Sequence, residues 1–433
     1  MRSFVGILFI VLLAACVHNK SVQVSGRVET GMTRDSVISF DVNGTSYEFK
    51  LDNKYFFSGK IPLEKGVYAR VYRPNSFDVY LSPGEDLEVN IVRNTVSPQF
   101  KGTLSAINNY LREQGRTMSY LPYEVYQMRE EEFIQRMQDM LNMNILLLEA
   151  KNLGDDFTNK ERERIRYKIA LQAVGYPSMH QVPDSVKYEP GIAFTDFITG
   201  FDFNNEELLS FPFYRQFLMN YFYYYKGKNM SGRRLVNYIL NNVTNLKVRD
   251  FLLSEVVYVY FAQNGLKDSD YLLSVCWNEV SDTSKLVKVR QLVDRWRKLS
   301  AGATAPNVLL TDASGKDVQL KDMRGKYLYI CVLTPSFGTM GEEKETTAWK
   351  ELVEEYKEKN IRFLTFATDE EAFSRVKNIP GEHFLLKDPD FYRSYMITNS
   401  PRFILINPDG RITDADASKP SGSMKLLLQN IGL

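Results

Sequence analysis

Cysteine and histidine are both rare in this sequence, with three of each in 433 residues. The cysteines are Cys16, Cys276 and Cys331, and the histidines are scattered along the chain. No cluster of the two residue types has the spacing of a zinc site, so the sequence predicts neither a metal centre nor a bound cofactor. Pairing of Cys276 with Cys331 stays open, because sequence separation says nothing about geometry. We expect instead that both are small, buried, apolar side chains.

An excess of charge of either sign is also missing. The sequence has 54 basic and 53 acidic side chains, which gives a formal net charge of +1. This balance offers no electrostatic footprint for nucleic acid, so we expect no nucleic-acid partner. With 44% hydrophobic and 25% charged residues, the composition is that of a globular protein long enough for two or three domains.

Long apolar runs are absent except at the N-terminus, where Arg2 precedes an apolar stretch from Phe4 to Leu13. This stretch is shorter than the ~20 residues of a membrane span and is typical of a signal peptide. The tetrad that follows, Leu13-Ala14-Ala15-Cys16, resembles the bacterial lipobox. That resemblance implies a signal peptide over residues 1–15 and a lipid such as palmitate on Cys16. The alternative is an ordinary secretory signal that happens to contain a cysteine.

The residues after Cys16 bear on localisation. Residues 16–21 form a short tether, and this segment has no acidic run of the kind that resembles surface-export signals. The second residue after the cysteine is not aspartate, which is linked to inner-membrane retention in enteric bacteria. We therefore expect a cell-envelope lipoprotein of the outer membrane that faces the periplasm, with the lipid as its only anchor.

Residues 22–103 have the pattern of a small β-sandwich. Apolar and polar residues alternate on both sides of Asn43-Gly44, which is a strong hairpin signal. Further short apolar runs are separated by turn residues such as Ser82-Pro83-Gly84. The runs 52–59, 80–85 and 100–103 resemble a β domain of unknown function that precedes thioredoxin-like domains in many Gram-negative lipoproteins.

Residues 104–299 change to a helical periodicity. An apolar stripe with one polar interruption at Asn144 consists of Phe133, Met137, Met140, Leu141, Asn144, Leu147 and Leu148. A second segment, 211–225, is rich in aromatic residues near one face: Phe213, Phe217, Tyr221, Tyr224 and Tyr225. That face is either a platform for peptide or sugar or part of a core, and we favour the core because large aromatics dominate cores.

Residues 300–433 alternate strands and helices, which predicts a central sheet covered on both faces. Four motifs occur in order: Gly302 to Pro306, Leu320 to Lys326, Ser400 to Phe403, and Asn407 to Gly410. Together they resemble the thioredoxin-like family, in particular its membrane-tethered thiol–disulfide oxidoreductase and peroxiredoxin-related branch. The expected fold class is therefore multidomain α+β, with an N-terminal β-sandwich, a helical middle region and a C-terminal α/β thioredoxin-like fold.

The family's Cys-x-x-Cys is missing at the position where the resemblance puts it. That motif lies between the first long strand and its helix, where the helix N-terminus lowers the thiol pKa. Counting back from the paired glutamates Glu342 and Glu343 places Phe337 and Met340 at the two cysteine positions, and no cysteine follows Cys331. Phenylalanine has no nucleophile and a methionine thioether forms no disulfide, so we predict no catalytic residue.

One family feature remains at Ser400 and Pro401. Pro401 matches the family's cis-proline, which in the family exposes backbone that pairs with an extended substrate segment. Pro401 beside Phe337 and Met340 would form an apolar, redox-silent cleft, or it simply maintains a turn. Our leading hypothesis is a binding or scaffolding lipoprotein that takes an extended protein segment. The alternatives are a thiol–disulfide oxidoreductase or peroxide-reducing enzyme that uses Cys331 or Cys276, and a glycan-binding lipoprotein.

Overall fold

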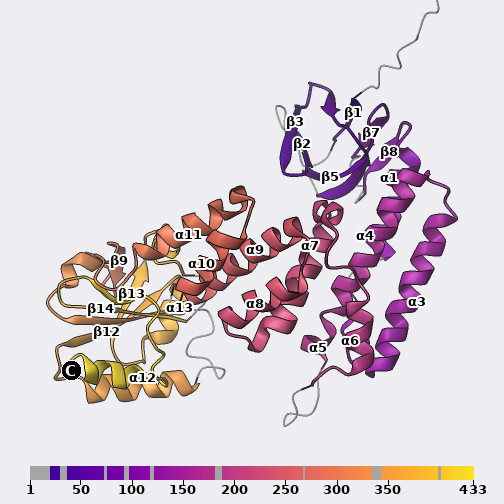
Figure 1. Cartoon of the computed structure of the whole chain (residues 1–433). Coiled ribbons are helices and arrows are strands. Elements are labelled where there is room, and N and C mark those ends of the chain that lie inside the picture. The colour runs from indigo at the N-terminus through magenta and orange to yellow at the C-terminus, as the bar shows by residue number, and fades with distance from the viewer. Residues whose placement is uncertain are drawn as a thin grey trace, which may run out of the picture. The chain divides into compact units, whose positions relative to one another are not determined.

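The computed structural model describes residues 20–29, 37–72, 76–91, 97–117, 121–180, 188–266, 269–333, 343–397 and 401–433. The chain divides into two compact units, Met1–Tyr221 and Phe222–Leu433 (Figure 1). Each unit contains a hydrophobic core of its own. None of the described helices is both long enough and apolar enough to cross a membrane.

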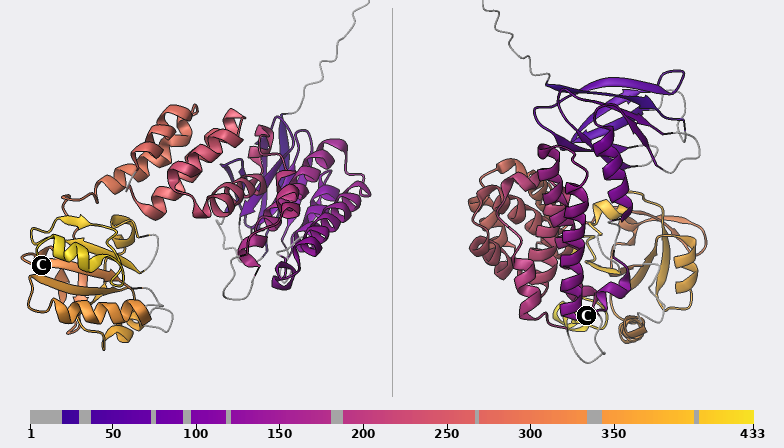
Figure 2. Two further views of the ribbon diagram at one scale, coloured as in Figure 1. Left: turned by 60° about the horizontal axis from the view of Figure 1, so that its bottom comes forward. Right: turned by 90° about the vertical axis from the view of Figure 1, so that its right-hand side faces the viewer.

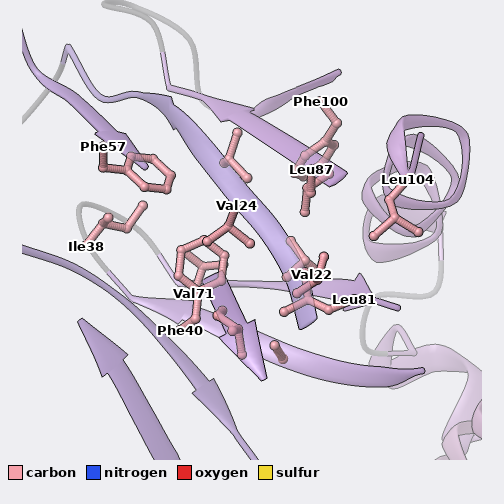
Figure 3. Packing of buried hydrophobic residues seen from close by; sticks show 14 of the residues in the cluster. Val22, Val24, Ile38, Phe40, Phe57, Val71, Leu81, Leu87, Phe100 and Leu104 are labelled. Atoms are coloured by element: carbon pink, nitrogen blue, oxygen red, sulfur yellow. The ribbon is translucent and has the colours of Figure 1, made fainter. Parts of the chain in front are cut away.

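The first unit begins with two four-stranded sheets that share one core. One sheet has the order β4 (Phe56–Pro62), β1 (Ser21–Arg27), β7 (Asp86–Asn90) and β8 (Gln99–Lys101). The other has the order β3 (Thr45–Lys50), β2 (Val37–Val42), β5 (Val67–Tyr72) and β6 (Phe77–Leu81). Every second side chain of β1 and β2 is buried, as the alternation predicts. Side chains from both sheets, among them Val24 and Phe40, meet in the core that Figure 3 shows.

The hairpin predicted at Asn43-Gly44 is confirmed. Val42 pairs with Thr45 across a two-residue turn, and both turn residues have positive φ, 52° at Asn43 and 87° at Gly44. Asparagine and glycine tolerate this left-handed conformation, which matches the twist of the flanking strands. The local sequence therefore sets the register of β2 against β3.

Helices complete the first unit. They are α1 (Ser105–Thr117), α2 (Tyr123–Tyr126), α3 (Glu130–Glu149), α4 (Asp155–Ala173), α5 (Tyr176–Met179), α6 (Ile192–Thr199), the 3₁₀ turn η1 (Glu206–Ser210) and α7 (Pro212–Met219). The helices α3 and α4 lie side by side (Figures 1 and 2). The stripe predicted on α3 is mostly buried, and the polar Asn144 is satisfied because its Nδ2 donates to the Met140 carbonyl at 2.7 Å. Leu147, which was predicted to lie in the stripe, is instead 48% exposed.

The aromatic segment does not form one face. Phe217 and Tyr221 are buried, whereas Tyr224 is 53% exposed. The reason is that α7 passes into a π-helical stretch, η2 (Asn220–Lys226), whose i→i+5 hydrogen bonds change the angle between successive side chains. A stripe extrapolated at 3.6 residues per turn therefore fails after residue 220.

The second unit starts with a helical part. It contains η3 (Gly227–Asn229), α8 (Gly232–Asn242), α9 (Leu246–Asn264), α10 (Asp270–Glu279), η4 (Thr283–Leu286) and α11 (Val287–Arg297). The apolar face of α11, which includes Leu292 and Trp296, is buried. Two of its basic side chains form ion pairs, Lys288 with Glu255 and Arg297 with Asp294.

The second unit ends in a seven-stranded mixed sheet. The strand order is β10 (Asp317–Gln319), β9 (Leu309–Asp312), β13 (Glu382–Leu386), β12 (Ile361–Ala367), β11 (Tyr327–Val332), β14 (Arg402–Ile406) and β15 (Ile412–Asp414). Its helical segments are η5 (Leu320–Met323), α12 (Glu343–Glu355), α13 (Glu370–Val376), α14 (Phe391–Ser394) and α15 (Met424–Asn430). β11 and β12 are parallel neighbours at the centre, and their nearly continuous apolar runs reflect burial on both faces.

Two helices cover the same face of this sheet. Trp349 of α12 and Met424 of α15 belong to one core cluster with Tyr329 of β11. The two helices lie side by side (Figures 1 and 2), and Lys425 Nζ lies 2.7 Å from the Glu355 carboxylate. α12, which follows β11 in the chain, is thereby held against this face of the sheet.

A buried amide in the first unit generates the first prediction. Asn108 of α1 accepts a hydrogen bond from the Tyr80 backbone N–H at 2.8 Å and donates one to the Tyr80 carbonyl at 3.0 Å. Asn108→Leu removes both partners from a buried strand, so the free energy of unfolding should fall by about 2–4 kcal/mol. Urea denaturation followed by circular dichroism measures this loss. Asn109→Leu, at the neighbouring helix position, is the control, and an equal loss in both variants would contradict the argument.

Candidate functional site

The candidate site lies where β11 ends. Val332, the last residue of β11, pairs with Phe366 of β12 on one side and with Arg402 of β14 on the other. The N–H of Leu333 donates to the Phe366 carbonyl at 2.9 Å, so the strand contact extends by one residue. Residues 334–342 lie outside the described residues, and α12 begins at Glu343. The order strand, connection, helix is the one that the sequence predicts.

The structure describes only some of the predicted site residues. Cys16, Phe337, Met340 and Ser400 lie outside the described residues, so their roles stay predictions. Pro401 is described, is half-buried and directly precedes β14. Because Val332 pairs with Arg402 in an antiparallel register, Pro401 lies beside the chain that leaves β11. The fold therefore brings Pro401 to the strand end from which the segment holding Phe337 and Met340 departs.

Arg402, for which the sequence predicts no role, directly follows Pro401 and is buried. Arg402 is 1% exposed although it carries a charge, and its Nη1 lies 2.8 Å from the Asp416 carboxylate. Its guanidinium carbon also lies 5.8 Å from the centre of the Trp296 ring of α11. Burial lowers the pKa of Arg402, while the nearby Asp416 opposes that shift. The sequence feature that could have indicated this ion pair is an arginine at the first position of the otherwise apolar strand Arg402–Ile406.

Cys331 is fully buried near the end of β11, one residue before Val332. It belongs to the core cluster on the α12 side of the sheet, together with Tyr329 and Trp349. Directly paired residues of parallel strands point to the same face, and Cys331 pairs with Thr365 of β12. A thiol with no exposed surface is inaccessible to an external disulfide or peroxide.

His383 lies next to Thr365, the strand partner of Cys331, and both of its ring nitrogens form hydrogen bonds. His383 of β13 pairs with Thr365, and its Nδ1 lies 2.6 Å from Thr365 Oγ1. Its Nε2 lies 2.9 Å from the Ile379 carbonyl, so we assign the ring proton to Nε2 and let Nδ1 accept from the threonine hydroxyl. Burial lowers the pKa of His383, which favours this neutral form. Such an imidazole is not available as a general base for Cys331.

Cys276 is the other described cysteine and is equally unsuited to attack. It lies in α10 with no exposed surface, and its Sγ is 3.9 Å from the Leu253 carbonyl. Burial raises the pKa of Cys276 to about 12, so the thiol is protonated at neutral pH. Both Cys276 and Cys331 are free thiols, which confirms the prediction of two small buried side chains. Within the described ranges, no group of three or more His, Cys, Asp or Glu side chains has a geometry that could hold a metal ion.

The family match of this chain lies in the C-terminal region. Residues 300–424 match the Redoxin family. The thiol-disulfide oxidoreductase ResA of a Bacillus cereus strain is 30% identical over 125 residues, which cover 27% of this chain and 69% of that protein. The protein of the same name from Bacillus thuringiensis subsp. konkukian is 31% identical over 123 residues, covering 27% and 68%. The thioredoxin domain of a thiol-disulfide oxidoreductase from Bacteroides vulgatus aligns with 31% of this chain and 98% of its own, at 22% identity and a TM-score of 0.27.

Thiol accessibility can be measured directly on a chain that starts at residue 17. Neither Cys276 nor Cys331 should react with an aromatic disulfide reagent within minutes in buffer, because both are buried; in urea both should react at once. Cys276→Ser and Cys331→Ser should each remove one thiol from the urea count. A native thiol that reacts within seconds, and disappears in one of these variants, would show that the cysteine concerned is accessible.

Proposed function

This chain belongs, through its C-terminal domain, to the thioredoxin-like thiol–disulfide oxidoreductase family, and we propose that in this member the domain binds an extended protein segment without exchanging disulfides. Membership confirms the thioredoxin-like fold that the sequence predicts for the C-terminal region. The chemistry is a separate matter, since one fold serves many functions.

The observation that carries the proposal is the absence of a usable thiol near the family's reactive position. No cysteine follows Cys331 in the sequence, so the segment between β11 and α12 contains none. Cys331 itself is fully buried within β11, and the nearby imidazole of His383 has both ring nitrogens engaged. A disulfide exchange needs a thiolate that meets its substrate, and neither Cys331 nor Cys276 is placed to supply one.

The binding role is supported by what the fold keeps. Pro401 lies at the start of β14, beside the chain that leaves β11. The family resemblance implies that backbone at this position pairs with an extended substrate segment. In this chain the partners of Pro401 in that cleft would be Phe337 and Met340, both apolar. An extended segment with apolar side chains would add its backbone hydrogen bonds at this edge and place its side chains on these residues.

The surroundings of the domain are part of the same proposal. The signal peptide over residues 1–15 would direct export, and the lipid on Cys16 would hold the chain on the outer membrane, facing the periplasm. The lipid then fixes the protein in one compartment, and the C-terminal domain presents its cleft to proteins there. A glycan ligand is less well supported, because two of the aromatic side chains that suggested one, Phe217 and Tyr221, are packed inside the first unit.

The second candidate function is the one printed for the relatives, thiol–disulfide exchange. An insulin-reduction assay with dithiothreitol separates the two. We expect no acceleration by the chain from residue 17 or by its Cys331→Ser variant, because neither of the remaining cysteines is exposed. The double variant Phe337→Cys/Met340→Cys, which restores Cys-x-x-Cys, should accelerate the reaction and serves as the positive control. Activity that is lost in Cys331→Ser would establish the enzymatic alternative.

Partner capture tests the cleft. Pro401→Asp places a charge at its wall, and capture of envelope proteins should fall at least about tenfold, equivalent to ~1.4 kcal/mol. Pro408→Asp is a matched control, because Pro408 is also half-buried but follows the opposite end of β14. Quantitative mass spectrometry of the captured proteins gives the readout. Species retained equally by Pro401→Asp and the unchanged chain would remove the support for this cleft.

A further inference from the structure

A cavity in the first unit has no role in the function proposed above. Its volume is about 390 Å³, within the usual size of small-ligand pockets. It lies among the second sheet of the sandwich, α1, α4 and α7, so its walls come from elements far apart in the sequence. The charged side chains that line it are four cations and one carboxylate: Arg70, Arg112, Arg164, Lys168 and Asp78.

Two of the four cations are balanced by carboxylates. Arg70 Nη1 lies 3.3 Å from Asp78, which is the carboxylate of the lining. Arg164 is held from behind by Glu161, a residue outside the lining, through Nε and Nη2 at 2.6 Å and 2.8 Å. These ion pairs hold the guanidinium groups of Arg70 and Arg164 in place, and each pair has no net charge.

The other two cations have no carboxylate partner within the described residues. Arg112 donates from Nη1 to the carbonyl of Pro98 at 2.9 Å. Lys168 forms neither a hydrogen bond nor an ion pair with the described residues, and its Nζ lies 5.7 Å from the centre of the Phe213 ring. Burial and the neighbouring Arg164 lower the pKa of Lys168 to about 8, while Glu161 and Asp78 oppose that shift. A half-buried ammonium without an anion is a destabilising arrangement that a bound anion would relieve.

The apolar part of the wall is aromatic. Phe77 and Phe100 line the cavity from the sandwich and contact each other with ring centres 6.2 Å apart. Phe213 lines it from α7, and the guanidinium of Arg164 lies 5.8 Å from its ring centre. A cavity with both rings and uncompensated cations suits a ligand that has an oxyanion on an aromatic or short apolar body.

We propose that this cavity binds a small organic oxyanion, a carboxylate or phosphate carried by a body of about one aromatic ring. The oxyanion lies at Lys168 and Arg112, and the ring packs on the phenylalanines of the wall. The site belongs to the first unit, so it is independent of the cleft at Pro401 and of the redox state of the C-terminal domain.

Calorimetric titration of the chain from residue 17 tests the site with defined probes. Phenyl phosphate and benzoate carry the ring and the anion, phenol carries the ring alone, and inorganic phosphate carries the anion alone. We expect saturable binding of phenyl phosphate or benzoate, at least tenfold weaker binding of inorganic phosphate, and none of phenol. The preferred probe identifies the oxyanion. Absence of saturable binding of both ring anions at millimolar concentration would overturn the proposal.

Variants assign the binding to Lys168. Lys168→Gln should weaken binding of the preferred probe at least tenfold, whereas Lys168→Arg should retain it. Lys60→Gln removes an exposed lysine from β4 and is the control. Because Lys168 has no described ion pair or hydrogen bond to lose, Lys168→Gln should unfold at the same temperature or higher, which excludes misfolding as the cause. Equal affinity in Lys168→Gln and the unchanged chain would overturn the assignment.

The pH dependence of probe affinity gives a further test, because a purely structural role of Lys168 would not make the affinity depend on pH. The other charged groups that face Lys168 are the carboxylates of Asp78 and Glu161 and the guanidinium groups of Arg70, Arg112 and Arg164. Burial raises the pKa of the nearby Tyr68 and Tyr110, so both stay neutral. An anion needs the protonated amine, so affinity should fall towards tenfold per unit as pH rises above 8 and should stay level in Lys168→Arg. A level profile in the unchanged chain would contradict the role of Lys168.

Discussion

One buried carboxylate holds the first unit together. Glu161 of α4 has no exposed surface, yet it accepts the hydroxyl of Tyr68 from β5 at 2.5 Å and the guanidinium of Arg164 through both of its oxygens. A buried charge is tolerated only when it is paired and hydrogen-bonded, so these contacts fix α4 against the second sheet of the sandwich. A parallel contact, in which Tyr80 of β6 donates to Asp156 at 2.5 Å, holds the first turn of the same helix. Arg164 belongs both to this network and to the wall of the cavity.

The second unit has the strand arrangement that the family resemblance implies. The central pairing of β11 with β12 and β14 places Pro401 at the strand end, as the family resemblance implies. Polar groups near that end are engaged in the structure itself, since Arg402 pairs with Asp416, and His383 is held by Thr365 and the Ile379 carbonyl. These contacts stabilise the sheet and offer no nucleophile, which is consistent with a domain that binds. The match to the Redoxin family covers residues 300–424, so the cavity of the first unit lies outside it.

Local sequence determined the features that depend on neighbouring residues. The turn at Asn43-Gly44, the hairpin of β9 and β10 around Ala313-Ser314-Gly315 and the apolar strand β11 follow from φ preference and alternation alone. The lack of a cysteine after Cys331 needs no structure at all. Each of these statements concerns residues that are close in the chain, and for that reason the sequence is sufficient.

Tertiary structure decided the rest. The aromatic segment gave a false single face because a π-helix replaces the α-helix at Asn220, a change set by packing. The sequence shows that residue 402 is a charged arginine, but only the packed structure shows that it is buried beside Asp416 and Trp296. The residues that line the cavity are spread over the sequence from Arg70 to Phe213. Which of their charges are paired is decided only when the helices and strands pack together. Periodicity describes one element at a time, whereas an uncompensated charge or a cavity is a property of several elements that meet in space.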